Sequence, residues 1–350
     1  MGIVTEYHTA VALIGALKSF MLTSAQYEVM LRIRSPARFL TMLRETTYGE
    51  VLPEPSPRFR VEDVEKRLLE HYYQVFGKVL RATPPSSKPV LEAMLRRHEV
   101  NCLKTLLRAV TYHVKSEEVL KEIVPVGRYD LDLCRKILGA KDLNEFIDSI
   151  EPDLKHSITP ALKLFEEKGS LIPVEIAMDN YALIRMWDSL KALSTHDREV
   201  AEHLIGIEVD FVNVMSVLRA RRLGIEVAML PISVYRYVEQ TLLDSMSRAS
   251  STVKAMELLK NTPYAIPAVK ASKDPSRALF RLEVEFKRYL ARESERVFLG
   301  DWFHIGTLIG FLNLKFYEVS DLIAMLNGKV DGLEVKEVRD ILILYQTSQS

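Results

Sequence analysis

The chain has 350 residues, of which 27% are charged and 48% are apolar, an ordinary balance for a globular protein. Lysine plus arginine and aspartate plus glutamate both number 47, so net charge does not draw the whole protein to nucleic acid or to an anionic bilayer. Two cysteines, Cys102 and Cys134, are too few for a disulfide framework. Both lie in apolar helical patterns, which favours small core residues in a reducing compartment.

The first apolar stretch without charges covers residues 9–17, and a similar one covers residues 302–314. Both are shorter than the roughly 20 residues that a helix needs to cross a bilayer. Glu6 precedes the first stretch and no basic residue does, which argues against a secretory signal. We therefore expect a cytoplasmic protein with no transmembrane span of its own.

Most of the chain follows the helical period of 3.6 residues, as residues 61–80 and 276–298 illustrate. Ser35-Pro36 and Asp274-Pro275 each place proline at the first helical position behind a residue that can cap the helix. Segments that should interrupt helices lie at residues 53–57, 83–89, 261–267 and 327–332. The sequence predicts an all-α protein with many helices of moderate length.

Two markers recur along the chain at a shared period near 110 residues. Residues 35–48 align with residues 251–264, and residues 141–152 align with both near the midpoint. Residues 99–109 and 210–220 both end in Leu-Arg-Ala, 111 positions apart. These recurrences predict three related helical-bundle repeats, which we place at residues 1–122, 123–229 and 230–350.

The segment from Ile205 to Gly224 predicts a helix that is apolar on almost every side. It nevertheless contains three polar residues and a run of arginines: Glu208, Asp210, Asn213, Arg219, Arg221 and Arg222. A charge without nearby water is tolerable only when it is paired and hydrogen-bonded. These groups therefore either close joints between repeats or line a polar cavity that a partner enters, and the residues alone leave both alternatives open. The corresponding candidates are Glu99, Asn101 and Arg108 in the first repeat, and Lys315 and Glu318 in the third.

No sequence motif for catalysis is present. The chain lacks a phosphate-binding glycine loop, a nucleophile elbow and a zinc-protease motif. His196 and His203 have no third metal ligand near them in the sequence, and the arginine run from Arg219 to Arg222 lacks the interleaved aromatics of a nucleic-acid surface. Gly306 and Gly310 have the spacing of closely packed helices. The sequence predicts no catalytic site, no cofactor, no metal and no nucleic-acid partner.

Two segments, FVNVMSVLRARRLG and DWFHIGTLIGFLNLKFYEVSDLIAMLNGKVDGLEVKEVRDILI, resemble the C subunit of archaeal and bacterial A/V-type rotary ATPases, whose eukaryotic counterpart is the d subunit of the V-ATPase. The resemblance covers essentially the whole chain. It implies three helical domains around a pseudo-threefold axis, forming a funnel with a central cavity. It also implies a non-catalytic, peripheral protein on the cytoplasmic face of the membrane, present once per complex.

In that family the protein couples the central-stalk shaft to the membrane ring of proteolipid subunits, in complexes that translocate protons or sodium ions. An unrelated α-helical repeat scaffold for protein–protein interaction is the main alternative, and it predicts an open, elongated superhelix. An all-α enzyme is a further alternative, which would require a deep apolar pocket with convergent titrating groups.

Overall fold

The computed structural model describes residues 2–54, 59–223 and 233–345, and helices are the regular elements of these ranges. The only bridge between extended residues there is an isolated one between Val126 and Tyr129. The structure therefore confirms the all-α class. Gly224, residues 55–57 of the first predicted interruption, and the predicted repeat boundary at 229/230 lie outside the described residues.

The longer helices are α1 (Gly2–Ser19), α4 (Val61–Ala82), α5 (Lys88–Thr111), α9 (Pro152–Lys168), α10 (Ile172–Ser189), α11 (Thr195–Leu223), α15 (Ala278–Arg296) and α16 (Ile305–Val330). The shorter ones are α2 (Ser24–Arg32), α3 (Pro36–Arg44), α6 (Ser116–Glu122), α7 (Leu131–Leu138), α8 (Leu143–Ser149), α12 (Gln240–Arg248), α13 (Thr252–Glu257), α14 (Ala265–Ser272) and α17 (Val335–Ile341). The described residues also include the 3₁₀ turns η1 (Leu190–Ala192), η3 (Leu258–Asn261) and η4 (Pro275–Arg277).

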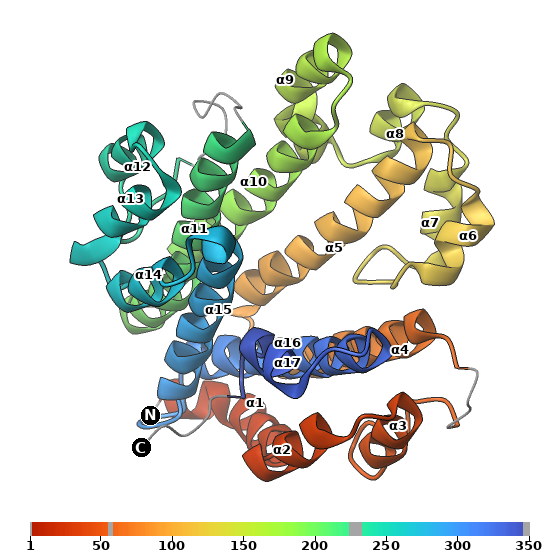
Figure 1. Cartoon of the computed structure of the whole chain (residues 1–350), viewed down its shortest axis with the longest axis vertical. Helices are drawn as coiled ribbons and strands as arrows, with labels where there is room; N and C mark the ends of the chain where they lie inside the picture. The colour runs from red at the N-terminus through yellow and green to blue at the C-terminus, as the bar shows by residue number, and fades with distance from the viewer. Residues whose placement is uncertain (1, 55–58, 224–232, 346–350) are drawn as a thin grey trace.

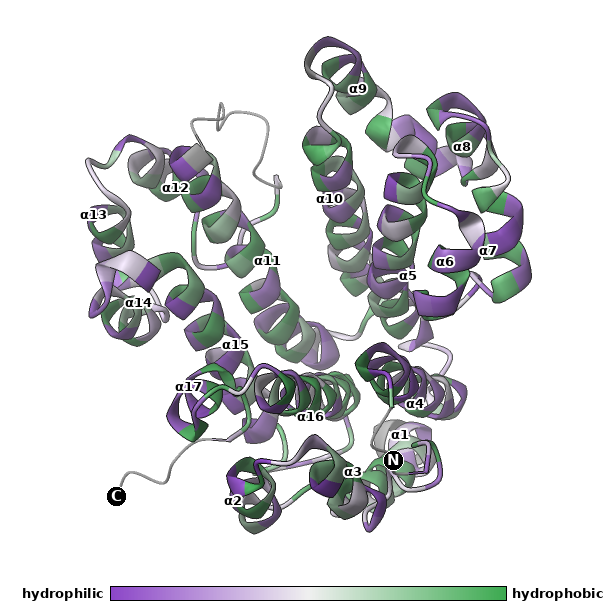
Figure 2. Ribbon diagram, turned by 45° about the vertical axis from the view of Figure 1, so that its right-hand side comes forward, coloured by the Kyte–Doolittle hydropathy of each residue, from purple (hydrophilic) through white to green (hydrophobic). Residues whose placement is uncertain are grey.

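The long helices pack in pairs. Helix α5 packs against α10, α11 against α15, and α16 against α4, while α16 also contacts α11 and α15. Figure 1 shows the short helices in three peripheral groups around these pairs: α2 and α3, α6 to α8, and α12 to α14. In Figure 2, α16 is hydrophobic along much of its length, which agrees with its position among α4, α11 and α15.

Local capping explains one predicted helix start and corrects the other. The Ser35 hydroxyl accepts the backbone N–H of Arg38, as a capping side chain before proline should. Pro275 does take the first position of the 3₁₀ turn η4, but the capping prediction is wrong for Asp274, whose carboxylate accepts the Ser276 hydroxyl and makes no side-chain cap bond. The first turn there is the 3₁₀ turn η4, and the α-helix begins only at Ala278.

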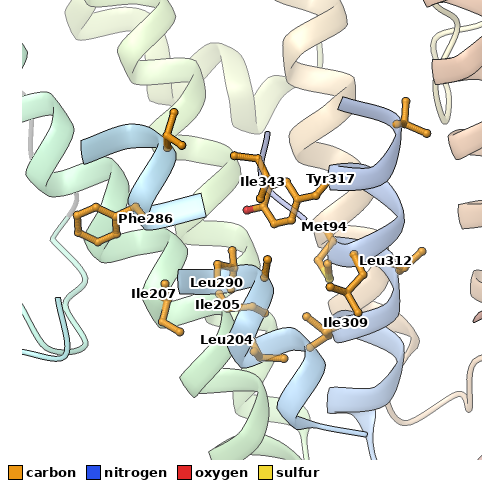
Figure 3. Close-up of a cluster of buried hydrophobic side chains, with 14 of the residues drawn as sticks. Met94, Leu204, Ile205, Ile207, Phe286, Leu290, Ile309, Leu312, Tyr317 and Ile343 are labelled. Atoms are coloured by element: carbon orange, nitrogen blue, oxygen red, sulfur yellow. The ribbon is translucent and has the colours of Figure 1, made fainter. Parts of the chain in front are cut away.

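The apolar core consists of two clusters of buried side chains. The larger cluster joins α1, α4, α11, α15 and α16, and Figure 3 shows part of it, with Leu204, Leu290 and Ile309 turned toward one another. The smaller cluster lies within residues 100–182 and joins α5 to helices α6 to α10. Each fully buried Leu or Ile contributes about 1.5–3 kcal/mol, so residues 100–182 are stabilised by a core of their own.

Gly310 lies at a close helix contact, and Cys102 and Cys134 are core residues, as the sequence predicted. A side chain at Gly310 would place its Cβ 2.7 Å from Val297 Cγ2 and 2.8 Å from the Ser294 carbonyl oxygen, which confirms close packing there. Cys102 and Cys134 are both buried and unbridged, with their Sγ atoms 3.9 Å apart. Among the described helices, none has the length and apolar composition needed to cross a bilayer.

Candidate partner-binding hollow and its buried charges

Three long helices carry a buried acid at matching places in the sequence. Glu99 on α5, Asp210 on α11 and Asp321 on α16 lie 111 positions apart and are 6%, 0% and 1% exposed. We call these three residues the brace acids, because each carboxylate holds a backbone segment that follows its helix. The sequence prediction included Glu99 and Asp210 but missed Asp321, although adding the 111-residue period to Asp210 would have found it.

The brace acids accept hydrogen bonds from main-chain N–H groups. Glu99 Oε1 accepts the N–H of Arg128 at 2.8 Å, and Asp321 accepts those of Ile343 and Leu344 at 2.7 and 2.8 Å. Asp210 accepts the N–H groups of residues 236 and 237 at 3.0 and 2.8 Å. Such bonds to a carboxylate are stronger than neutral ones, and each satisfies a backbone donor in the segment after the helix.

Burial raises the pKa values of the brace acids. Desolvation raises the pKa of Glu99 to about 7, although the Arg96 guanidinium, 2.9 Å away, opposes the shift. Desolvation likewise raises the pKa of Asp321 to about 7 against the opposing backbone N–H groups, and it raises the pKa of Asp210. The brace acids are therefore structural groups whose charge is costly, rather than freely ionised surface residues.

A second recurring contact accompanies the brace acids. The hydroxyls of Thr46, Ser149 and Thr262 each donate to the carbonyl three residues earlier, at 2.6–2.7 Å. Two positions after these hydroxyl residues stand Tyr48, Glu151 and Tyr264. Tyr264 donates its hydroxyl to Asp210 at 2.8 Å. Glu151 accepts from Arg96 at 2.6 Å, beside Glu99. The same local turn thus precedes Tyr264, which donates to Asp210, and Glu151, which shares Arg96 with Glu99. The third such residue, Tyr48, donates to Glu318, which is not a brace acid.

Lys315 and Glu318 form a buried joint. Lys315 Nζ lies 2.8 Å from Glu318 Oε1, and both side chains are at most 5% exposed. Tyr48 donates to the same oxygen at 2.7 Å, and the Leu22 N–H donates to Oε2 at 2.6 Å. Because these contacts connect α16 to the segments around α2 and α3, the pair closes a joint inside the chain instead of facing solvent.

Glu208 is the polar residue of α11 that fits both alternatives, joint and cavity. It forms an ion pair with Arg97 of α5, and their side chains are 20% and 30% exposed. The pair therefore joins α11 to α5. Both residues also line a cavity of about 120 Å³ at the point where the long helices converge.

That central cavity is bordered by side chains from α4, α5, α10, α11, α15 and α16. Its walls are aromatic and polar: Tyr72, Arg97, His98, Asn101, Glu208, Phe211, Phe286, Lys287, Asn313, Phe316 and Tyr317 are among the lining residues. His98 and Asn101 also line a cavity of about 490 Å³ beside α4 and α6. Lys287, Phe316 and Tyr317 also line one of about 220 Å³ between α15 and α16. We call the three adjoining cavities the hollow.

His98, which lines two cavities of the hollow, lies among aromatic rings. The His98 ring centroid lies 5.3 Å from that of Phe316 and 5.4 Å from that of Tyr72. Burial lowers the pKa of His98 to about 3, and the neighbouring Arg97 charge contributes to this shift. Burial also lowers the pKa of Arg97. Arg97 and His98 therefore lie beside aromatic rings in a setting that disfavours positive charge, although the Arg97 side chain is 30% exposed.

The other predicted residues are distributed between the hollow and helix joints. Arg108 lines the 490 Å³ cavity and is held by both oxygens of Glu175, each 2.6 Å away. Arg219 is 2.7 Å from Glu283. Asn213 is buried and donates Nδ2 to a carbonyl, Arg221 donates to two carbonyls in the last turn of α12, and Arg222 is exposed. The structure thus brings Asn101, Arg108 and Glu208 to the hollow but not the arginine run as a whole.

Residues 2–54, 59–223 and 233–345 contain no group of three His, Cys, Asp or Glu side chains that could hold a metal ion. His203 instead contacts Glu293 and Tyr237 at 2.9 and 2.8 Å, and His196 is exposed. Sequence reasoning missed Arg97, His98 and Lys287 of the hollow, because no local pattern separates them from ordinary helix residues.

Comparison with known proteins gives one consistent result. The family model described as ATP synthase (C/AC39) subunit matches residues 10–341. The C subunit of the A-type ATP synthase of Methanocaldococcus jannaschii is 23% identical over 313 residues, covering 86% of this chain and 77% of that protein. The corresponding protein of Halobacterium salinarum is 22% identical over 350 residues, covering 97% and 98%. That of Methanosarcina mazei is 21% identical over 348 residues, covering 97% and 93%.

Proposed function

Because this chain belongs to the ATP synthase (C/AC39) subunit family, we propose that it is the non-catalytic socket of an A/V-type rotary ATP synthase. In this role it couples the central-stalk shaft to the membrane proteolipid ring, and the chemistry of ATP belongs to other subunits. The observation that carries the proposal is the hollow, whose central cavity is bordered by all three pairs of long helices. A socket needs a concave surface at such a convergence.

We also propose that three related units surround the hollow. The brace acids support this, since each lies on one long helix of a pair and holds the segment that follows that helix in the chain. The contacts favour units made of α5 to α10, of α11 to α15, and of α16 and α17 together with α2 to α4. The boundaries predicted from the sequence stay predictions. The boundary at 122/123 separates α5 from α10, which pack against each other.

The lining of the hollow suits a shaft that transmits torque. Arg97, Glu208 and Lys287 offer both signs of charge, while Phe211 and Phe316 offer apolar area. Charge-assisted contacts orient a partner and resist slipping better than an apolar surface alone. Aromatic and arginine side chains are also the groups that most often dominate protein interfaces.

The proposed position is peripheral, on the cytoplasmic face of the membrane, with one copy in each complex. Affinity purification of the tagged chain from its native membranes in mild detergent tests this assignment. We expect stalk and proteolipid subunits to elute with it. Elution of the chain alone, or with unrelated proteins only, would remove the proposed function.

Two arginines test the interface more finely. Arg219 is about half exposed and Arg222 is exposed, so their joint replacement by alanine should leave the isolated chain helical. We expect Arg219→Ala with Arg222→Ala to weaken retention of the stalk on the ring, which co-elution measures. Unchanged retention and unchanged coupling in the reconstituted complex would exclude these two residues from the interface.

A further inference from the structure

Helix α14 exposes an apolar face that its counterpart elsewhere in the chain does not have. Ile266 and Val269 are both 64% exposed, and they lie on one side of the helix because they are three residues apart. Lys270 and Lys273 each follow one of them by four residues and are exposed as well. We call these four residues the α14 face.

Helix α9 supplies an internal comparison. Ser149 precedes the N-cap of α9, and Thr262 that of α14, by two residues, and both hydroxyls donate to the carbonyl three residues earlier. Counted from these caps, Ile266 corresponds to Asp153 and Val269 corresponds to His156. The two α9 residues are exposed and polar, and Asp153 pairs with Arg185 at 2.6 Å.

This comparison separates the requirements of the fold from those of binding. Both helices bury the positions that pack inward, such as Ile158 on α9 and Ala271 on α14. The outward positions are free to be polar, as α9 demonstrates. The fold therefore does not require two adjacent aliphatic side chains in contact with water at these positions.

The charge around the α14 face identifies the kind of partner. Helix α14 contains no acidic residue. Lys260, Lys273 and Arg277 are exposed and make no ion pair with any other described residue. The nearby acids are already matched, since Glu257 lies 2.9 Å from Lys254 and Asp274 lies 3.5 Å from Arg281. Uncompensated positive charge beside an aliphatic pair is complementary to carboxylates beside aliphatic side chains.

The position of α14 favours a protein over a lipid surface. It packs along the side of α15, with Lys270 Nζ 3.5 Å from Glu285 and the Tyr264 ring 5.6 Å from that of Tyr289. Helices that lie in a membrane interface are usually longer, and they present Trp, Phe or Leu. This one has eight residues, and the two apolar side chains that it exposes are β-branched.

We propose that the α14 face docks a helix of another subunit of the rotary complex, one that carries aliphatic side chains flanked by Glu or Asp. The partner helix lies across Ile266 and Val269 while its carboxylates meet Lys273, which has no ion pair within the described residues. This contact lies outside the hollow, because none of these four residues lines it. The proposal rests on the proposed function, which supplies the complex.

Photo-cross-linking within the purified complex tests the proposal. Val269→Cys, labelled with benzophenone maleimide, places a reactive group on the α14 face, and His156→Cys is the matched control on α9. The native cysteines are at most 6% exposed, so labelling is directed to the introduced one. We expect an adduct at position 269 with an acidic, aliphatic peptide of another subunit, at least about fivefold more abundant than at position 156.

A charge-reversed chain supplies the second arm. Lys273→Glu, added to Val269→Cys, should reduce the adduct about fivefold, because an attractive contact becomes repulsive while the Lys270–Glu285 ion pair is kept; circular dichroism verifies that the variant is folded. An adduct with lipid, equal adducts at both positions, no adduct, or an adduct insensitive to charge reversal would overturn the α14 proposal. Failure of the chain to elute with stalk and ring subunits would instead overturn the proposed function.

Discussion

Replacing Asp321 with asparagine tests whether the brace acids stabilise the fold as neutral or as charged groups. The carboxylate is 1% exposed and accepts the N–H groups of Ile343 and Leu344, one on each oxygen. Asparagine keeps one acceptor oxygen and directs an amide donor at the other N–H group. One buried N–H then loses its acceptor, which costs about 1–3 kcal/mol, and the remaining bond changes by less.

The size of the effect should depend on pH. Burial raises the pKa of Asp321 from 3.8 to about 7, which corresponds to a difference on the order of 4 kcal/mol. A carboxyl whose pKa is higher in the folded state contributes stability that is complete below pH 3.8, the unfolded value, and is lost as pH rises toward about 7. Asparagine does not titrate. The destabilisation caused by Asp321→Asn should therefore be about 2–3 kcal/mol greater at about pH 5 than at about pH 8.

Urea unfolding followed by circular dichroism at both pH values measures this difference. Asp331→Asn is the matched control, because Asp331 is exposed at the end of the same helix, and it should change stability by less than about 0.5 kcal/mol. Equal destabilisation by Asp321→Asn at the two pH values, or greater destabilisation at the higher one, would refute the reasoning. Asp321 would then act as an ionised brace whose N–H bonds outweigh its desolvation.

Two further substitutions probe other buried contacts by thermal unfolding. Lys315→Met leaves the Glu318 carboxylate buried without its cation, which should cost about 3–5 kcal/mol, and adding Glu318→Gln should restore part of that loss; a single variant as stable as the parent would contradict the importance of the pair. Gly310→Ala places a methyl group 2.7 Å from Val297 and should cost about 1–3 kcal/mol, whereas Gly300→Ala meets no atom within 4 Å and should have little effect. Similar melting temperatures for the two alanine variants would show that α16 is less closely packed than described.

The features that could be predicted from the sequence are those that local periodicity encodes. The helical period and the proline-linked starts indicated the fold class, and α4 spans Val61–Ala82 where the pattern indicated residues 61–80. The 111-residue recurrence identified Glu99 and Asp210 as equivalent before any contact was known. Asp321 was accessible by the same arithmetic, but the prediction for the third repeat selected Lys315 and Glu318 instead.

The remaining features depend on partners that are distant in the chain. Nothing near Glu208 in the sequence indicates Arg97, because the two meet only when α11 packs beside α5. The sequence left open whether the polar residues close joints or line a cavity, and the structure gives different answers for different residues. Asp210 and Glu318 are held inside the chain. Glu208 pairs with a residue of another helix and also lines the central cavity. Such long-range pairings have no local signal.

The contacts of Glu318 have a consequence for synthesis. Its two oxygens hold the Leu22 N–H and the Tyr48 hydroxyl, residues 296 and 270 positions earlier in the chain. The segments around α2 and α3 are synthesised early, whereas Glu318 is synthesised near the end of the chain. The Leu22 N–H and the Tyr48 hydroxyl therefore cannot bind their acceptor until almost the whole chain has been translated. Residues 100–182, which have an apolar core of their own, can fold before Glu318 is synthesised. Folding of this chain therefore finishes where translation began.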